Sequence, residues 1–538
     1  MEREYTVIAN TREDLPALEA EITASSGAGP IPNRSVDIAN PRPGSKIQTH
    51  FMLTDEEAEA LRSDPRVRAV EIPPDQRDDI SIGLNASQFG RFFRGSGLNS
   101  EYVNWGLRRC VSTTNNYYDI DINSRITEVA GPYEYAIDGT GVDVVIQDSG
   151  IDPGHPDWND YDGVSRLQQI DWYTESGVPG TQSADHYRDL DGHGSHCASI
   201  AAGLLYGWAK GARIYSQKLA GLETLSGSDG TGIAISNAFD CIRLWHNAKT
   251  NGRPTVVNMS WGYGANVTGD PTSGVYRGTA WTYGVDYTTR SALQAATGVS
   301  QHYFGGGTSH RIPVRVTSVD AEVDDMITDG IHVCIAAGNN LHKADLPAGA
   351  DYDNTSTFSG TSRTYHRGSS PYSLNAFMVG NIDSGFQNSS GTAQEAESQD
   401  QTSVSTTRGP GVNIFAPGTN IMAATSRDYD TGSYTITGYP SDGTFPIMSI
   451  GGTSMASPQV AGVVAQHLQV FPNLTPAQMQ ARIFADSKAV LFTTGSDTDY
   501  GRIYDSLMGA PNRMLFSRYG KQAITTNVSS ILGSITAT

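Results

Sequence analysis

The feature that most constrains the fold is a set of short apolar runs, rich in β-branched residues, that recur from Gly141 onward between segments of helical pattern. Each run is apolar on both of its faces, which is typical of a strand buried on both sides of a parallel sheet. Such strands, alternating with helices, predict an α/β fold of three layers, a mostly parallel sheet flanked by helices. The runs are Val142–Ile146, Arg213–Tyr215, Thr255–Val257 and Ile331–Ile335.

A small α+β unit is expected over residues 1–77, ahead of this sheet. Its pattern is strand, helix, strand, strand, helix, strand (βαββαβ), an order typical of a ferredoxin-like sheet. Thr54 can cap the second helix and Glu57 can reach back to it, which predicts a capping box. The expected strands are Tyr5–Ile8, Arg34–Ile38, Ile47–Leu53 and Val67–Ile72, and the first helix is Leu15–Ile22.

The rest of the chain divides by composition. Residues 78–100 are polar and rich in glycine, so we expect an exposed linker, the kind of segment in which proteolytic processing occurs most readily. The large unit is expected over 101–500, with insertions at about 263–318 and 341–410, because polar stretches of that length are usually functional or decorative loops. Residues 501–538 are expected to form a C-terminal tail.

Charge and hydropathy argue against two classes of partner. Among 538 residues there are 37 basic and 57 acidic side chains, and the net charge of −20 would repel phosphates, so no nucleic-acid partner is expected. No apolar run reaches the length that spans a bilayer, so no membrane partner is expected. No secretory signal is visible at Met1, which leaves a cytoplasmic, a virion-associated or a non-classically secreted protein open.

The cysteine pattern predicts reduced thiols. The chain has four cysteines, too few and too widely spaced for a disulfide framework or a CxxC metal site. They are Cys110, Cys197, Cys241 and Cys334.

Three short stretches carry side chains suited to catalysis. One apolar strand ends in Asp148, and catalytic groups gather at the carboxyl ends of parallel strands. His193 lies between glycines at the start of a small-residue helix, where other backbone can approach the imidazole. Ser454 follows two glycines at the start of an apolar helix, where backbone N–H groups favour a developing negative charge. Each stretch alone has a plain structural interpretation: a turn aspartate, a structural histidine and a helix N-cap.

Together the three stretches resemble one family. Aspartate, histidine and serine follow one another in the chain order of subtilisin. The strings D-S-G-I-D at 148–152, H-G-S-H-C-A at 193–198 and G-T-S-M-A-S-P at 452–458 resemble the subtilase (subtilisin-like, S8) family of serine proteases. The wording around His193 is most similar to the proteinase K branch, with Ser195 where threonine is usual.

The resemblance implies a serine endopeptidase, a hydrolase in which Ser454 attacks a peptide carbonyl, His193 takes its proton, and Asp148 fixes the tautomer of the imidazole. Asn339, which follows the string A-A-G, would bind the oxyanion together with the Ser454 backbone N–H. Asn340 is the competing assignment.

The resemblance also implies that a protein or peptide substrate adds a strand by backbone hydrogen bonds. Trp261 stands where leucine is common in the family, so its ring could narrow a substrate subsite. The insertion from 263 could wall the cleft or point outward. The implied substrate-binding residues are Ser260, Trp261, Gly262, Ala336, Ala337 and Gly338.

In this family a βαββαβ pro-region often precedes the catalytic domain and inhibits it until it is cut off. Residues 1–77 are therefore expected to be a propeptide, the intramolecular inhibitor of an autoprocessed zymogen. An ordinary accessory domain is the alternative.

No cofactor is expected for the chemistry, whereas structural calcium is possible, because acidic loops such as Asp351–Asp353 offer oxygen ligands. The sequence indicates no specific metal site. Cys197 is expected to be a small buried thiol, and the resemblance to thiol-bearing subtilases predicts sensitivity to mercurials.

Two rival functions differ in their demands on these residues. A structural or virion-associated protein could use a subtilase domain as a scaffold, but it would have no need of an intact catalytic set. A sedolisin-type acid protease also has a G-T-S serine, but it needs a glutamate where this chain has H-G-S-H.

Overall fold

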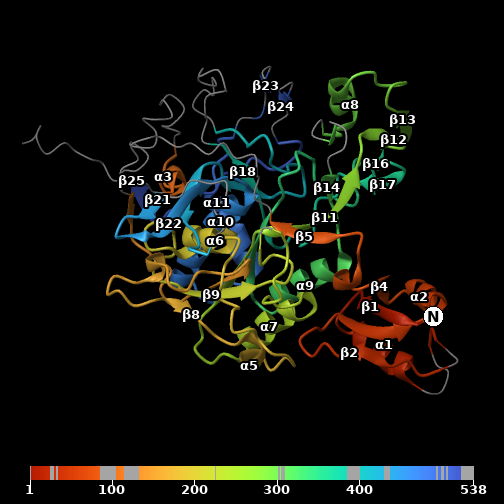
Figure 1. The fold of residues 1–538 in the computed structure, drawn as a ribbon, viewed down its shortest axis with the longest axis horizontal. Helices are drawn as coiled ribbons and strands as arrows, with labels where there is room; N and C mark the ends of the chain where they lie inside the picture. Colours follow the sequence, from red (N-terminus) through yellow and green to blue (C-terminus); the bar gives the residue numbers. More distant parts are fainter. Residues whose placement is uncertain are drawn as a thin grey trace, which may run out of the picture.

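The protein consists of a small N-terminal unit, at the lower right of Figure 1, and a larger body that holds the rest of the chain. The computed structural model describes residues 2–24, 29–31, 34–84, 104–113, 133–224, 226–300, 303–304, 309–383, 400–428, 437–491, 493, 495–497, 502–504 and 507–522.

A seven-stranded sheet, parallel throughout, forms the centre of the larger body. The apolar runs of the sequence supply its central strands, and β7 lies between β9 and β10. In spatial order the strands are β19 (Ile414–Pro417), β18 (Phe377–Ile382), β15 (His332–Ala336), β10 (Thr255–Met259), β7 (Asp143–Asp148), β9 (Arg213–Lys218) and β8 (Leu167–Gln168).

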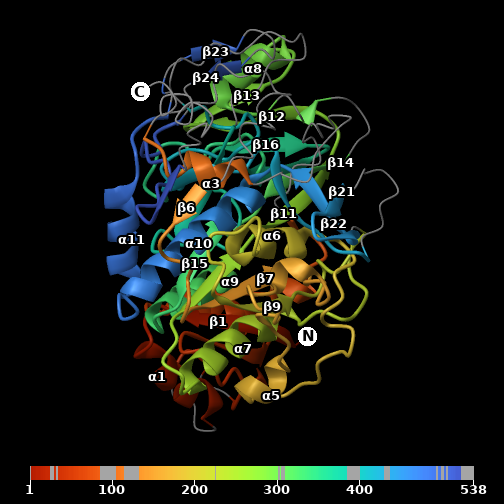
Figure 2. The same ribbon diagram turned by 90° about the vertical axis from the view of Figure 1, so that its left-hand side faces the viewer.

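Helices cover both faces of this sheet (Figures 1 and 2). Alternate residues of β7 point to opposite faces, so Val144 and Ile146 join one hydrophobic core and Val145 joins the other. The predicted three-layer α/β fold is confirmed. The first core includes residues of α6 (His193–Ala202), α10 (Thr453–Val470) and α11 (Pro476–Asp486), and the second includes residues of α5 (Trp172–Ser176), α7 (Ile235–Ala248) and α9 (Thr317–Thr328).

The N-terminal unit has the expected βαββαβ order around its own core. Its sheet is antiparallel with the order β2-β3-β1-β4. The strand expected over Arg34–Ile38 was placed too early, because the backbone N–H of Val36 donates to the Ile22 carbonyl at the end of α1 and pairing with β3 begins only at Ile38. The elements are β1 (Arg3–Ala9), α1 (Asp14–Thr23), β2 (Ile38–Asn40), β3 (Gln48–Leu53), α2 (Asp55–Arg62) and β4 (Val67–Glu71).

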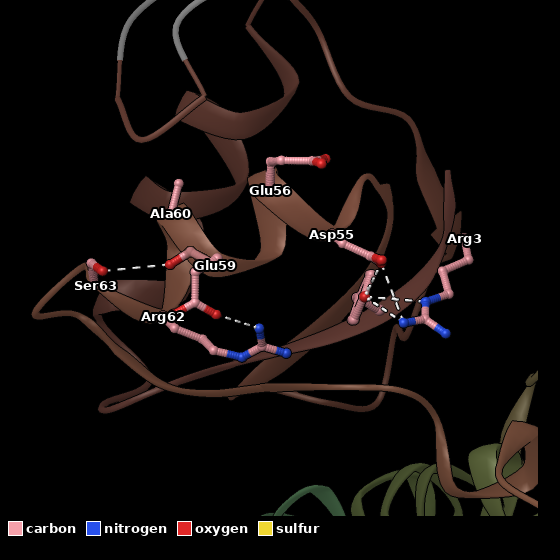
Figure 3. A pocket seen from close by; sticks show the side chains of 8 residues that line it. Arg3, Asp55, Glu56, Glu59, Ala60, Arg62 and Ser63 are labelled. Carbon is pink, nitrogen blue, oxygen red and sulfur yellow. Dashed lines mark hydrogen bonds and ion pairs between the residues drawn. The ribbon is translucent and has the colours of Figure 1, made fainter. Parts of the chain in front are cut away.

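Helix α2 begins with the predicted capping box, in which Thr54 and Glu57 bond each other's backbone N–H groups. Figure 3 shows the outer side of this helix, where Arg62 donates a hydrogen bond of 2.8 Å to Glu59 one turn earlier. Both side chains of this pair are largely exposed. Such surface pairs contribute little to stability.

Residues of the two expected insertions fold together beside the main sheet. β12 (Pro271–Tyr276) and β13 (Thr279–Thr282) join β16 (Thr355–Phe358) and β17 (Thr361–Thr364) in one antiparallel sheet, in the order β13-β12-β16-β17. This sheet and α8 (Arg290–Thr297) lie at the upper right of Figure 1 and surround a separate aromatic-rich core.

Two expected boundaries are wrong. The range 341–410 is not one insertion, because it contains β18, a fully buried strand of the central sheet whose short apolar run is masked by the polar residues around it. The expected tail over 501–538 is not all tail, since Met514 and Leu515 are buried in the main core and the Met514 carbonyl accepts from Lys488. Residues 523–538 lie outside the described part of the chain.

The remaining elements lie outside the central sheet. The residues expected to form a linker begin with a strand, β5, and residues 85–100 lie outside the described part. No helix in that part is both long and apolar enough to cross a bilayer. These elements are β5 (Ser81–Leu84), α3 (Trp105–Arg109), β6 (Tyr133–Tyr135), β11 (Trp261–Thr268), β14 (Ser309–Pro313), β20 (Ile421–Ala424), β21 (Thr437–Tyr439), β22 (Asp442–Ile450), β23 (Gly495–Asp497), β24 (Arg502–Tyr504) and β25 (Gly520–Gln522), with two short 3-10 turns at Pro74–Gln76 and Pro156–Trp158.

Candidate active site

Asp148 and His193 meet at the carboxyl edge of the central sheet. Asp148 is the last residue of β7 and His193 is the first residue of α6. His193 Nδ1 lies 2.8 Å from Asp148 Oδ1, and the same oxygen accepts a hydrogen bond of 2.7 Å from the backbone N–H of Ser149. Because a carboxylate oxygen accepts hydrogen bonds, this contact places a proton on Nδ1, and in the neutral form of the imidazole Nε2 is then the acceptor.

Glycines allow the two segments to approach this closely. Gly192 caps α6 with a φ of 79°, a left-handed conformation that favours glycine. A Cβ on Gly194 would lie 2.1 Å from the carbonyl oxygen of Gly150. The prediction that the glycines around His193 permit a close approach of other backbone is confirmed.

A buried carboxylate that the sequence analysis did not single out, Asp189, joins the same two segments. Its Oδ1 accepts from Ser149 Oγ and the Gly192 N–H, each at 2.8 Å, and its Oδ2 accepts from Ser195 N–H at 2.9 Å and Ser195 Oγ at 2.6 Å. Burial raises the pKa of Asp189, although these donors favour its charged form. The sequence signal for this role was that Asp189 lies only four residues before His193. Spacing alone, however, does not distinguish a carboxylate that joins two segments from an ordinary loop residue.

Ser454 is the second residue of α10. It follows Gly452, which is the N-cap, and Thr453, which is the first residue of the helix. Its Oγ donates to the Ser260 carbonyl at 3.0 Å, and Ser260 Oγ donates back to the Ser454 carbonyl at 2.9 Å. Within the described part of the chain, His193 Nε2 has no hydrogen-bond partner. The structure therefore joins His193 to Asp148, and it joins Ser454 to Ser260 rather than to His193.

Asn339 is held next to the first turn of α10. Its Oδ1 accepts from the Thr453 N–H at 3.0 Å and from Thr453 Oγ1 at 3.1 Å. These bonds turn the acceptor side of the amide toward the helix. Asn340, the competing assignment, donates its Nδ2 to the Arg311 carbonyl at 3.1 Å and is thereby tied to β14.

The electrostatics of the site favour a charged imidazole. Burial by itself lowers the pKa of His193, but the Asp148 carboxylate, with a further contribution from Cys197, outweighs it and the pKa is raised well above its ordinary value. Burial also raises the pKa of the neighbouring Asp191 to about 7. Asp148 is thus the dominant stabiliser of the protonated form of His193.

Cys197 lies one turn after His193 and touches two members of the site. Its Sγ is 3.8 Å from His193 Nδ1 and 3.4 Å from the Ser454 carbonyl oxygen. Burial raises the pKa of this thiol. All four cysteines are free thiols, as predicted, and all four are buried. Asp148, His193 and Cys197 also offer potential metal-ligand atoms within 4.8 Å of one another.

The acidic loop considered for calcium does not fit that ion. The Asp351 carboxylate already accepts hydrogen bonds from Arg277 and Lys343 at 2.7 Å and from Asn354 Nδ2 at 3.0 Å. Two basic side chains therefore neutralise the charge that calcium would need.

The expected substrate strand is occupied by a segment of the same chain. β5 pairs antiparallel with β11, with Leu84 opposite Trp261, Gly83 opposite Gly262 and Ile82 opposite Tyr263. The other edge of β11 pairs with β14. One part of the first insertion, β14, thus lies directly beside β11, on the edge away from β5, whereas the β12-β13-β16-β17 sheet lies farther out (Figure 1).

The second expected substrate segment, residues 336–338, is engaged elsewhere. The Ala337 N–H donates to the Val379 carbonyl at 3.0 Å, and the Gly338 N–H donates to Thr453 Oγ1 at 3.1 Å. β5 makes no ladder with these residues. The Trp261 ring is fully buried against Tyr263, with ring centroids 6.0 Å apart, so it forms part of the base of this region.

Comparison with known proteins identifies the family. The model described as "Subtilase family" (Peptidase_S8) matches residues 139–502. The chain belongs to the subtilase family. The match covers the β7, α6 and α10 segments and the subtilisin-like fold built on them.

Several proteases with established names are similar over most of the chain. "Alkaline serine exoprotease A" of Vibrio alginolyticus is 25% identical over 86% of this chain and 57% of its own length. "Subtilisin-like protease 3" of Saccharomyces cerevisiae is 24% identical over 87% of this chain and 70% of its own length. The crystal structure of a cold adapted subtilisin-like serine proteinase is 21% identical, with a TM-score of 0.44, over 77% of this chain and 98% of its own. The chain therefore spans little more than half the length of the Vibrio relative.

The position of Cys197 leads to a chemical test. We expect a small organomercurial to inhibit peptide hydrolysis, because mercury on Sγ would push against both His193 and the start of α10. Cys197→Ala should retain activity after treatment, whereas Cys334→Ala, which removes another buried thiol, should be inhibited like the wild type. Full activity of wild type in which mass spectrometry shows mercury on Cys197 would contradict this prediction.

Proposed function

We propose that this protein is a serine endopeptidase that uses Asp148, His193 and Ser454. The observation that carries the proposal is the buried 2.8 Å contact between His193 Nδ1 and Asp148, which orients Nε2 as a base at the start of α6. Ser454 is brought to the same region because α6 and α10 pack together and Cys197 touches both His193 and the Ser454 backbone.

Proton transfer requires the Ser454 hydroxyl, which now donates to the Ser260 carbonyl, to leave that acceptor and turn toward His193 Nε2. Hydrogen bonds of catalytic groups are often misaligned without substrate and tighten as it binds. His193 would take the proton as Ser454 attacks, and return it to the leaving amine, while Asp148 stabilises the imidazolium.

The negative charge that develops on the substrate carbonyl needs donors near Ser454. We assign this role to Asn339 Nδ2 and the Ser454 backbone N–H at the start of α10. Support comes from the two hydrogen bonds that fix Asn339 Oδ1 on Thr453, because an amide held by its acceptor side presents its donor on the opposite side. Such a donor is worth roughly 10² to 10³ in turnover.

Protein or peptide substrates would bind as β5 does, as an added antiparallel strand on β11. Backbone pairing supplies affinity that is independent of most side chains, so many sequences can bind. The pairing of β5 with β11 supports inhibition of the full-length chain by its own N-terminal segment.

We infer that residues 1–77 form an inhibitory prodomain, and its interface with the catalytic domain supports this. The Arg42 guanidinium donates to Asp240 and Glu322 of α7 and α9, each at 2.8 Å, and all three side chains are almost fully buried. Arg12 pairs with Asp325 at 2.9 Å. Apolar packing of Ile8 and Ile47 on Ala321 completes the contact.

The cut that releases the prodomain should fall between β5 and α3. Helix α3 is part of the catalytic domain, since Trp105 Nε1 donates to the Thr419 carbonyl and Arg109 forms a fully buried ion pair with Asp400. Asn104, its N-cap, donates to Gln459 of α10 at 2.9 Å. A chain end near residue 104 would therefore remain attached to the mature enzyme.

Activity and processing can be tested in one experiment. We expect a fluorophosphonate probe to label purified wild type and wild type to lose its N-terminal unit with time, because both reactions need an activated serine. Ser454→Ala should remain full length and unlabelled. N-terminal sequencing of the mature form should give an end between residues 85 and 104. Intact wild type that is already active would refute the zymogen, and a full-length chain that is never labelled would refute the protease.

The raised pKa of His193 sets a pH dependence. The base must be neutral to accept a proton, so kcat/KM should fall as pH drops through a value above the ordinary range of imidazole. In Asp148→Asn the main charge that raises this pKa is gone, so the acidic limb should move to lower pH, with a loss of rate of roughly 10⁴-fold. The check is kcat/KM for a small peptide ester against pH. A limb that does not move in the variant would show that Asp148 does not set it.

The buried Arg42 contact predicts how tightly the N-terminal unit docks on the catalytic domain. In a Ser454→Ala background, Arg42→Ala removes the guanidinium that bridges the buried Asp240 and Glu322 carboxylates, which should weaken docking by about 3–5 kcal/mol. Faster hydrogen–deuterium exchange in β5 and at the α7–α9 surface would report it. Arg62→Ala, which removes the exposed arginine of Figure 3, is the matched control and should leave exchange unchanged. Equal exchange in both variants would mean that Arg42 is not an anchor.

A further inference from the structure

Arg311 reaches the docked strand from the far edge of β11. It lies on β14, where it is opposite Asn266 of β11. Residues directly opposite each other in an antiparallel pair share a face, and alternate residues of one strand share that face too. Arg311 therefore projects on the same side of the sheet as Gly264 and Gly262, while Trp261 and Tyr263 are buried on the other side.

The guanidinium crosses β11 and makes hydrogen bonds on both sides of the strand junction. Arg311 Nη2 donates to the Gly262 carbonyl at 2.9 Å and to the Ser81 carbonyl of β5. It thus bonds the backbone of the docked segment directly. The Arg311 carbonyl is in turn held by Asn340, the neighbour of the oxyanion residue.

Glycine on the docked strand makes room for this side chain. A Cβ built on Gly83, which is opposite Gly262, would lie 1.5 Å from Arg311 Nη1 and 2.4 Å from its Cζ. A Cβ on Gly264 would lie 2.5 Å from Arg311 Cγ. A side chain at the position of Gly83 therefore requires the guanidinium to leave its hydrogen bonds.

Arg311 keeps its positive charge in this position. Burial lowers the pKa of Arg311 to about 10, with Tyr263 acting in the opposite direction. A guanidinium with that pKa is still protonated at neutral pH. Its donors thus remain available to the carbonyl groups of a docked peptide.

We propose that Arg311 determines specificity by selecting peptides with glycine at the position that pairs with Gly262. This rests on the proposed function, with β5 standing in for a bound substrate. The insertion that carries β14 thereby selects the residue at one position of the peptide. Arg311 excludes a side chain at that position and donates a hydrogen bond to the carbonyl two residues earlier. Arg311 does not discriminate among side chains on the opposite face of the peptide, such as that of Ile82.

The peptide test compares two internally quenched substrates that differ by one methyl group. One contains Ser-Ile-Gly-Leu, the sequence of β5, and the other contains Ser-Ile-Ala-Leu at the same place before the cut. We expect processed wild type to prefer the glycine peptide by roughly tenfold or more in kcat/KM. Arg311→Ala should lose this preference, mainly by cleaving the alanine peptide better. Arg290→Ala, which removes a half-exposed arginine of the same insertion, should keep it.

A second experiment uses the full-length chain, in which β5 is the docked strand. Gly83→Ala should slow self-processing by roughly tenfold, and Arg311→Ala in the same chain should restore it, which is the signature of direct coupling. Ile82→Val, on the other face, should leave the rate near that of wild type.

The possible failures are distinguishable. Equal cleavage of both peptides by wild type, or an equal loss on both in Arg311→Ala, would overturn the specificity role and leave only a backbone contact. Fluorophosphonate labelling of Ser454 in each variant reports the protease separately, so loss of labelling would point to the proposed function instead.

Discussion

The geometry of the site depends on one buried carboxylate, that of Asp189. A charge removed from water is tolerated only when donors surround it, and Asp189 has four, drawn from the end of β7 and the start of α6. Because these two segments carry Asp148 and His193, satisfying Asp189 also sets the distance between them. The 2.8 Å contact of the pair is then a consequence of how the two segments are joined.

The fold and the meeting of Asp148 with His193 were largely predictable because the signals for both are local in the sequence. Apolar runs identify buried strands without knowledge of their partners, and the strings around Asp148, His193 and Ser454 lie at strand or helix ends, where the topology gathers them. The same locality explains the correct βαββαβ order and the capping box of α2. Strand β18 was missed because its short apolar run, Phe377–Val379, was averaged into a long polar stretch.

Contacts between distant segments were not predictable in this way. Nothing in the spacing of Arg42 indicates that it meets Asp240 and Glu322, and nothing near Arg311 indicates that it lies over Gly83. Such pairs depend on how two separately folded units dock, and each partner taken alone has the appearance of an ordinary surface residue. Asp189 was missed for a related reason, since its donors come from both sides of a tertiary junction.

The two edges of β11 are not equivalent. One edge is paired with β14, whereas the other holds β5, which continues from the N-terminal unit. Under the proposed function, an incoming polypeptide would need the same row of backbone groups as β5, so the two would not be bound together. Occupancy by one would then reduce the apparent affinity for the other without altering the turnover of molecules that are already bound. Restraint of this kind would be competitive, and a sufficiently high concentration of substrate would overcome it.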